Sequence, residues 1–236
     1  MQSASPDLSS PPAPDAARAV SPPGVSVALP LSAEDQARAD LYALAARLLL
    51  APPDAALLAG LAHADPIKAG GGDHQLADAW EKLGLASSVM DADAVAEEFD
   101  TLFVSSGTPA VNPYGSLYLS GFMHDTPLAE LRADLNAFGI GRVRGVAESE
   151  DHLGALCETM RVLIAGGSAG GLAIRRQPLG RQKAFFEARI APWYGRCLDD
   201  MAKAAGANFY RLVAAFVAAL LTIEAEAFAV EDGFDD

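Results

Sequence analysis

The spacing of the apolar residues constrains the fold more than any other feature of this chain. Large apolar residues recur three or four positions apart in one segment after another, as in Leu41, Leu44 and Leu48. This spacing is typical of helices that bury one face. No run alternates strictly over the length of a strand, and β-branched residues are sparse. The pattern therefore predicts an all-α protein of about ten helices.

Proline and glycine indicate how this helical chain is divided. Residues 1–31 hold seven of the 15 prolines, with Ser and Ala between them, which predicts a disordered tail. Residues 32–236 are predicted to form a single helical domain. Within it, the glycine-containing segment 140–147 is expected to act as a hinge between subregions at about 32–139 and 148–236. Such a hinge would also permit a homodimer by domain swapping.

Three polar residues stand where helices are expected to begin. Ser32, Ser149 and Asn208 each precede an apolar helical pattern, so each is predicted to be an N-cap. Pro192 lies inside the pattern that contains Phe185 and is expected to bend or split that helix.

The charge and the cysteine usage exclude several classes of function. The chain has 17 Lys and Arg against 31 Asp and Glu, a net charge of −14, which disfavours nucleic acid and anionic membranes as partners. Cys157 and Cys197 do not form a C-x-x-C pair, so they are expected to be buried thiols in a reducing compartment. No secretory signal is apparent, and the apolar stretch Leu212 to Ile223 is too short to span a bilayer. We therefore expect a cytoplasmic protein without stable membrane insertion.

Two residues give alternative, enzymatic interpretations. Ser168 lies in a G-x-S-x-G sequence, but a nucleophile elbow needs a strand before the serine, and a loop between helices is expected here. His152 follows Asp151 and lies four residues after Glu148, although this spacing does not match a paired metal motif. The alternatives are thus a helical hydrolase or metal-binding enzyme using Ser168 or His152, or a plain helical interaction scaffold. We expect no catalytic residue, no bound metal and no cofactor.

Three short motifs occur in a fixed order along the chain. They are EFDTLFV at residues 98–104, NPYGSLY at 112–118 and ESEDHL at 148–153. Together they resemble the TorD/DmsD/NarJ family of molybdoenzyme-specific chaperones, also called redox enzyme maturation proteins. The resemblance runs from about residue 38 to 228 and includes the later Pro192-Trp193 pair. The sequence departs from the family pattern at Glu150, where the family has a proline before Asp-His.

The resemblance implies a cytoplasmic chaperone that is not an enzyme. Its partners would be a molybdoenzyme catalytic subunit of the DMSO reductase superfamily and the twin-arginine signal peptide of that subunit. It would bind the signal peptide, the apo form, or both, and support insertion of the cofactor before export or assembly. The resemblance places ten residues in client binding: Phe99, Leu102, Phe103, Pro113, Tyr114, Ser116, Tyr118, Glu148, Asp151 and His152. Tyr114, Asp151 and His152 are expected on the client-binding surface rather than in the core.

Overall fold

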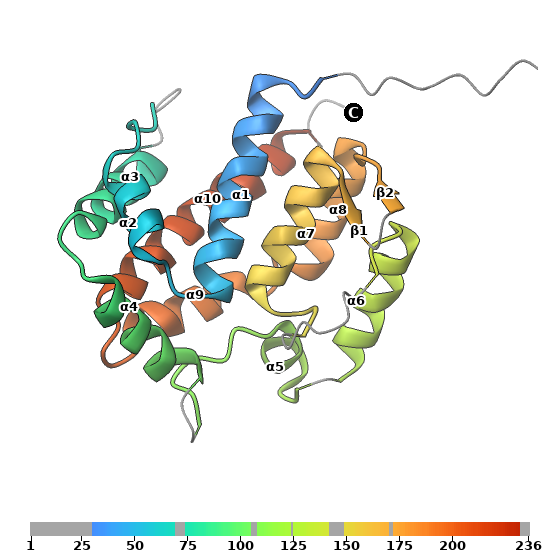
Figure 1. Ribbon diagram of the computed structural model, residues 1–236. Helices are drawn as coiled ribbons and strands as arrows, with labels where there is room; N and C mark the ends of the chain where they lie inside the picture. The colour runs from blue at the N-terminus through green and yellow to red at the C-terminus, as the bar shows by residue number, and fades with distance from the viewer. Residues whose placement is uncertain are drawn as a thin grey trace, which may run out of the picture. The chain divides into compact units, whose positions relative to one another are not determined.

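The computed structural model describes residues 30–68, 74–104, 108–123, 125–141, 149–169 and 172–231 (Figure 1). Residues Leu31–Asp236 form one compact unit. Over the described residues the fold is all-α, as predicted, with ten α-helices, one π-helix and a two-stranded hairpin. The elements are α1 (Ala33–Leu50), α2 (Ala55–Ala62), α3 (Gln75–Ser87), α4 (Ala92–Phe99), the π-helix η1 (Asp100–Val104), α5 (Gly115–Ser120), α6 (Thr126–Ala137), α7 (Leu153–Ala165), β1 (Gly167–Ala169), β2 (Leu172–Ile174), α8 (Leu179–Arg189), α9 (Tyr194–Lys203) and α10 (Phe209–Glu231).

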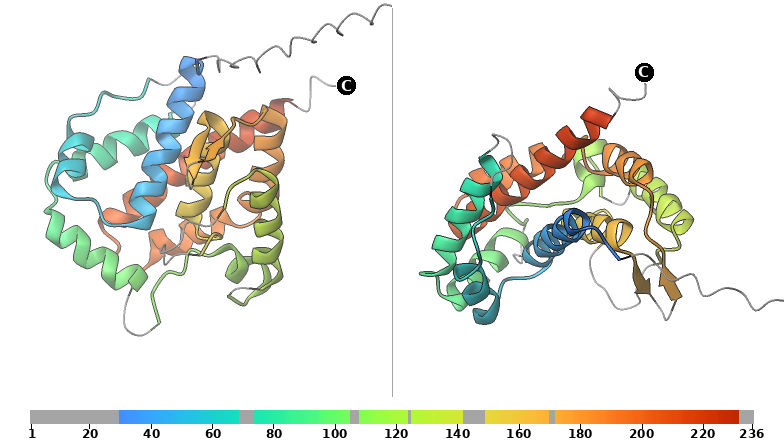
Figure 2. Two further views of the ribbon diagram at one scale, coloured as in Figure 1. Left: turned by 45° about the vertical axis from the view of Figure 1, so that its right-hand side comes forward. Right: turned by 90° about the horizontal axis from the view of Figure 1, so that it is seen from above.

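The α1–α7 pair lies at the centre of the fold, where the two helices pack side by side (Figures 1 and 2). Ser32 caps α1 as predicted, because its Oγ accepts a hydrogen bond from the Asp35 amide at 3.0 Å. Gly154 allows the close approach of the two helices, since a Cβ at this position would lie 2.8 Å from Leu50 Cγ. This packing joins residues from both predicted subregions in one core.

Helix α10 packs against α9, α3 and α1. By length and hydropathy alone, Phe209–Val230 is the one described stretch that could cross a membrane, and half of that stretch is buried in the fold. Asn208 directly precedes α10, as predicted, but its side chain does not cap the helix and instead donates to the Gly206 carbonyl at 3.1 Å. The carboxylate of Glu98, from α4, accepts hydrogen bonds from the amides of Asn208, Phe209 and Tyr210 at 2.8–3.1 Å. A distant side chain thus satisfies the amides that a local cap would otherwise bind.

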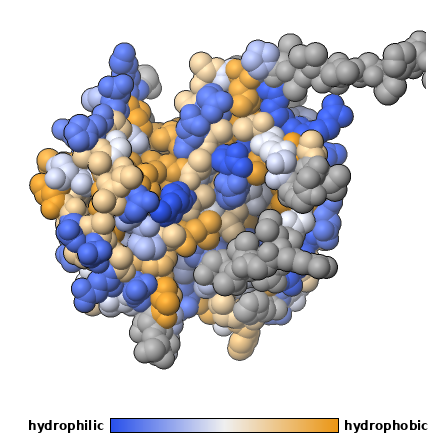
Figure 3. All heavy atoms as spheres, in the orientation of Figure 1, coloured by the Kyte–Doolittle hydropathy of each residue, from blue (hydrophilic) through white to orange (hydrophobic). Residues whose placement is uncertain are grey.

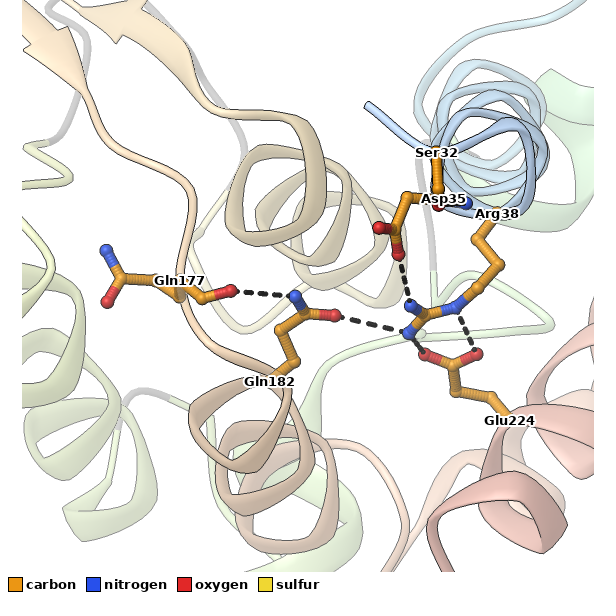
Figure 4. A network of polar contacts seen from close by, with 6 residues as sticks. All are labelled: Ser32, Asp35, Arg38, Gln177, Gln182 and Glu224. Atoms are coloured by element: carbon orange, nitrogen blue, oxygen red, sulfur yellow. Dashed lines mark hydrogen bonds and ion pairs between the residues drawn. The ribbon is translucent and has the colours of Figure 1, made fainter. Parts of the chain in front are cut away.

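A polar network fastens α10 to α1 and α8 (Figure 4). Arg38 on α1 pairs with Glu224 on α10, whose side chain is only 5% exposed. The same guanidinium donates to Asp35 at 3.0 Å and to Gln182 at 3.2 Å. Gln182 in turn donates to the Gln177 carbonyl at 2.9 Å. Burial of the Glu224 carboxylate is therefore compensated by an ion pair and by hydrogen bonds on its partner.

The segment after α7 differs from the prediction. A loop was expected around Ser168, but β1 and β2 pair antiparallel, with Ser168 opposite Ala173. Each strand has only three residues, and Gly167–Ala169 are small, so no alternating apolar pattern marks the hairpin. Helix α8 ends at Arg189 and α9 begins at Tyr194, which confirms the break predicted at Pro192.

Polar and apolar residues are interspersed on the face shown in Figure 3, where the apolar residues gather mainly toward the left and centre. Exposed apolar side chains include Leu85 and Val89 near the end of α3, and Phe122 after α5. Residues 1–29 and 142–148 lie outside the described residues, and with them most of the predicted tail at 1–31 and most of the predicted hinge at 140–147.

Candidate functional site

Two of the sequence motifs meet in space. The backbone of the 112–118 motif pairs with the segment before α7: the Gly115 amide donates to the Asp151 carbonyl at 2.9 Å, and the Leu153 amide donates to the Pro113 carbonyl at 2.8 Å. Tyr114 and His152 form an antiparallel bridge between these contacts. The Tyr114 loop and the start of α7 therefore form a single clamped unit.

Asp151 is a structural carboxylate in this unit. It is only 4% exposed, and its Oδ2 accepts hydrogen bonds from the Ser116 amide at 2.9 Å and from the Ser116 hydroxyl at 2.6 Å. Burial by itself would raise the pKa of Asp151, but the hydrogen bonds from the Ser116 hydroxyl and amide hold that pKa below its usual value. Asp151 was expected on the client-binding surface, and that placement is wrong because both motifs close over it.

His152 is likewise buried, at 4% exposed, where the sequence placed it on the surface. It is the N-cap of α7, in place of Ser149, because its Nδ1 accepts the Gly154 amide at 3.0 Å. An accepting Nδ1 places the proton of a neutral imidazole on Nε2. The ring packs edge-on against Tyr114, with 5.1 Å between ring centroids. Glu148, its expected neighbour, lies outside the described residues.

Tyr118 extends the clamped unit toward α9. Its ring stacks on Trp193, with centroids 5.5 Å apart and planes 22° apart, and Trp193 is fixed by a 2.7 Å hydrogen bond from its indole nitrogen to the Arg189 carbonyl. A Cβ at Gly115 would lie 3.2 Å from the Trp193 ring, so glycine permits this contact. Burial and the neighbouring Cys197 and Asp200 raise the pKa of Tyr118, which keeps its hydroxyl a donor to Asp200 at 2.9 Å.

The first motif forms a separate aromatic cluster. Phe99 and Phe103 contact each other and Tyr210 of α10, with ring centroids 5.0–5.6 Å apart. Phe99 and Leu102 are buried and Phe103 is half-buried. The cluster joins the second motif through the Val111 amide, which donates to the Leu102 carbonyl at 3.0 Å. The neighbouring Glu98, which caps α10, was not identified from the sequence, because a contact across 110 residues leaves no local pattern.

Most of the predicted site residues are therefore inaccessible. Among the nine that the structure describes, only Phe103, Tyr114 and Tyr118 are half-buried, and the other six are buried. A cleft of about 460 Å³ opens beside Tyr118. Its lining comes from the loop before α5, from α5, and from α9 with the residue that follows it: Ala110, Val111, Asn112, Leu117, Tyr118, Arg196, Asp200, Lys203 and Ala204. Accessible aromatic edges and a cleft of this size are typical of a recognition surface.

The geometry does not match the enzymatic alternatives where it can be checked. Ser168 lies within strand β1 after a helix, and not at the strand-to-helix turn that a nucleophile elbow requires. His152 is engaged as a cap. Among the residues that the structure describes, no group of three or more His, Cys, Asp and Glu side chains could hold a metal ion. Cys157 and Cys197 are buried, and burial raises the pKa of each thiol to about 12, so both thiols are protonated at neutral pH.

Comparison with known proteins gives a family. Residues 71–199, more than half of the chain, match the family model described as "Nitrate reductase delta subunit". No curated protein matches the chain. The matched region contains all three motifs, the clamped unit and, of the cleft-lining residues on α9, Arg196. The chain belongs to the nitrate reductase delta subunit family of NarJ/TorD-type chaperones, which bind the catalytic subunit of a molybdoenzyme during its maturation.

Proposed function

We propose that this chaperone acts in the cytoplasm on the apo form of its molybdoenzyme, binds the twin-arginine signal peptide of the catalytic subunit, and supports cofactor insertion before export or assembly. One observation carries the proposal. The 112–118 segment is clamped to the start of α7 by the Asp151 and His152 contacts, yet it leaves Tyr114 and Tyr118 half-buried, and Tyr118 lines a cleft. A rigid loop that presents aromatic edges binds a peptide with little loss of conformational entropy.

The site residues divide into two roles under this proposal. Phe103, Tyr114 and Tyr118 contact the client, because their rings are partly accessible. The buried members hold those rings in place; they are Phe99, Leu102, Pro113, Ser116, Asp151 and His152. Glu148 is proposed as a contact for a client cation, on its charge and its position in the third motif alone.

The chemistry of a twin-arginine peptide supports the proposal. Its apolar segment would bury against aromatic edges, as apolar peptides do in hydrophobic grooves. Its arginine pair would be attracted to a chain of net charge −14. Raising the salt concentration should therefore weaken binding by screening that attraction.

The test is titration of the full chain with the twin-arginine signal peptide of the molybdoenzyme encoded nearest to its gene, and with the catalytic subunit itself. Tyr114→Ala and Tyr118→Ala should each weaken peptide binding about tenfold, as loss of an aromatic anchor does. Leu85→Ala, which removes an exposed apolar side chain on α3, serves as the control and should leave binding unchanged. Replacing both peptide arginines by glutamine should also weaken binding. If neither the peptide nor the subunit binds the wild-type chain, the proposed function is wrong.

A further inference from the structure

The cleft beside Tyr118 has a charge pattern that differs from the rest of the molecule. Three of its lining side chains are charged, namely Arg196, Asp200 and Lys203, and they lie one helical turn apart along α9. Val111, Leu117 and Ala204 supply apolar lining beside them. Cations outnumber carboxylates in this lining, whereas acidic residues outnumber basic ones 31 to 17 in the whole chain.

Arg196 is held in a fixed position but is not neutralised by a close carboxylate. Its Nη2 donates to the Tyr118 carbonyl at 2.7 Å, and its guanidinium carbon lies 5.8 Å from the centroid of the Tyr118 ring. Within the part of the chain that the structure describes, Arg196 forms no ion pair, and its remaining N–H donors have no hydrogen-bond acceptor. A guanidinium held in this way is preorganised to donate two hydrogen bonds to a carboxylate.

Asp200 and Lys203, the other charged residues of the cleft, do not prevent Arg196 from binding a carboxylate. Asp200 accepts the Tyr118 hydroxyl at 2.9 Å, so its carboxylate faces the tyrosine and not Arg196. Lys203 pairs with Asp199 at 3.0 Å, but the two side chains are 74% and 70% exposed. An ion pair in that setting contributes little to stability, so the ammonium can exchange Asp199 for a ligand.

We propose that this cleft binds an acidic peptide segment of the client, with Arg196 as the primary carboxylate contact, Lys203 as the second, and Val111, Leu117 and Ala204 against a neighbouring apolar side chain. The proposal rests on the proposed function, since it takes the client as the source of the peptide. A twin-arginine pair does not fit this cleft, because Arg196 and Lys203 would repel it. The arginine pair and the acidic segment therefore occupy different parts of the surface.

A peptide is favoured over a small anion by the shape and lining of the cleft. The cleft lies between a loop and a helix, and apolar groups line it beside the cations. A carboxylate with an adjacent apolar side chain would satisfy both kinds of lining at once. The overall charge of −14 repels anions at long range, so an acidic peptide must gain its affinity from close contacts.

The experiment uses calorimetric titration of the full chain with a short acetylated peptide in which leucine and aspartate alternate. The matched probe has asparagine in place of each aspartate. We expect the aspartate peptide to bind about tenfold more tightly than the asparagine peptide, since charge-assisted contacts to guanidinium are the stronger ones. Arg196→Gln should remove most of that preference, Arg196→Lys should retain part of it, and Lys203→Gln should reduce it by a smaller factor. Arg181→Gln, an exposed arginine on α8, is the control and should change nothing.

Several outcomes would overturn the proposal. These are no binding of the aspartate peptide, equal binding of the two peptides, or equal losses in Arg181→Gln and Arg196→Gln. Circular dichroism checks that each variant folds, and Lys203→Gln decides the question if Arg196→Gln does not fold, because Lys203 is largely exposed. If the catalytic subunit binds the wild-type chain while the peptides do not discriminate, the cleft proposal fails and the proposed function stands. If the subunit does not bind at all, the proposed function itself fails.

Discussion

At Asp151, one carboxylate joins two segments that are 35 residues apart in the chain. Asp151→Ala would remove the carboxylate that accepts hydrogen bonds from the Ser116 amide and hydroxyl, at a site where Ser116 is 0% exposed. We expect a loss of about 2–3 kcal/mol in the free energy of unfolding, typical of a buried hydrogen-bonded charge. Urea denaturation measures this loss. Asp199→Ala, at an exposed carboxylate, should change stability by less than about 0.5 kcal/mol. A similar loss in both variants would contradict the structural role.

The same carboxylate makes stability depend on pH. Because the pKa of Asp151 is lowered in the folded state, its contribution is present above the unfolded pKa, about 4, and is lost as the pH falls through the folded value. Asn does not titrate at this position. The difference in stability between the wild type and Asp151→Asn should therefore be largest near neutral pH and should shrink below about pH 4. Urea midpoints measured at pH 7 and at pH 3 test this, and a difference that stays constant would count against it.

Glu98 also stabilises the fold, through hydrogen bonds to residues that are far from it in the sequence. Glu98→Ala would leave three amides at the start of α10 without their acceptor, so we expect a loss of about 1–2 kcal/mol, as for loss of an N-cap. Glu98→Gln keeps an acceptor oxygen and should lose less. Glu97→Ala, at the exposed neighbouring position, is the control. Equal melting temperatures for Glu98→Ala and Glu97→Ala would show that the contact does not stabilise α10.

Among the elements, those set by local pattern were predictable and those set by distant contacts were not. Helices α1 and α7 follow from their apolar spacing, and the break between α8 and α9 follows from Pro192. The caps of α7 and α10 were misassigned because His152 and Glu98 compete with the local Ser149 and Asn208, and only the tertiary structure decides between them. The hairpin was missed because its strands are too short for any periodicity to be visible.

The buried ion pair between Arg38 and Glu224 links α1 to α10, and this gives a prediction about the packing of the two helices. Arg38→Met or Glu224→Leu alone would leave one buried charge without its main partner, so each should cost about 3 kcal/mol. The double variant should cost clearly less than the sum of the two, because apolar groups can replace a buried ion pair at little cost. A double-mutant cycle by urea denaturation measures the coupling. Strict additivity of the two losses would show that the ion pair does not link the two helices.

At the scale of the molecule, the three sequence motifs come together in space, but the sequence did not indicate which of their residues are buried. The second and third motifs meet through the Tyr114–His152 bridge, and the first connects to them through Leu102 and Val111. Their order along the chain carries the family pattern but no information on burial. Asp151 and His152 were therefore expected on the surface, whereas they are buried and join the Tyr114 loop to the start of α7. The charged part of the cleft lies on α9, outside every motif, and only folding brings Arg196 to Tyr118.

The last prediction concerns the whole chain without its first 31 residues. The composition of residues 1–31 offers too little apolar area to offset the entropy of ordering them. A chain that begins at Ser32 keeps the α1 cap, because the acceptor of the Asp35 amide is Ser32 itself. We therefore expect unchanged helical ellipticity and a melting temperature within about 2 °C of the full chain, which corresponds to less than about 1 kcal/mol. A second deletion that also removes Ser32 is the comparison and should melt lower, by the loss of one N-cap. A large drop on removing residues 1–31 alone would mean that the tail contributes contacts to the helical domain, and its composition would then be a poor guide to its role.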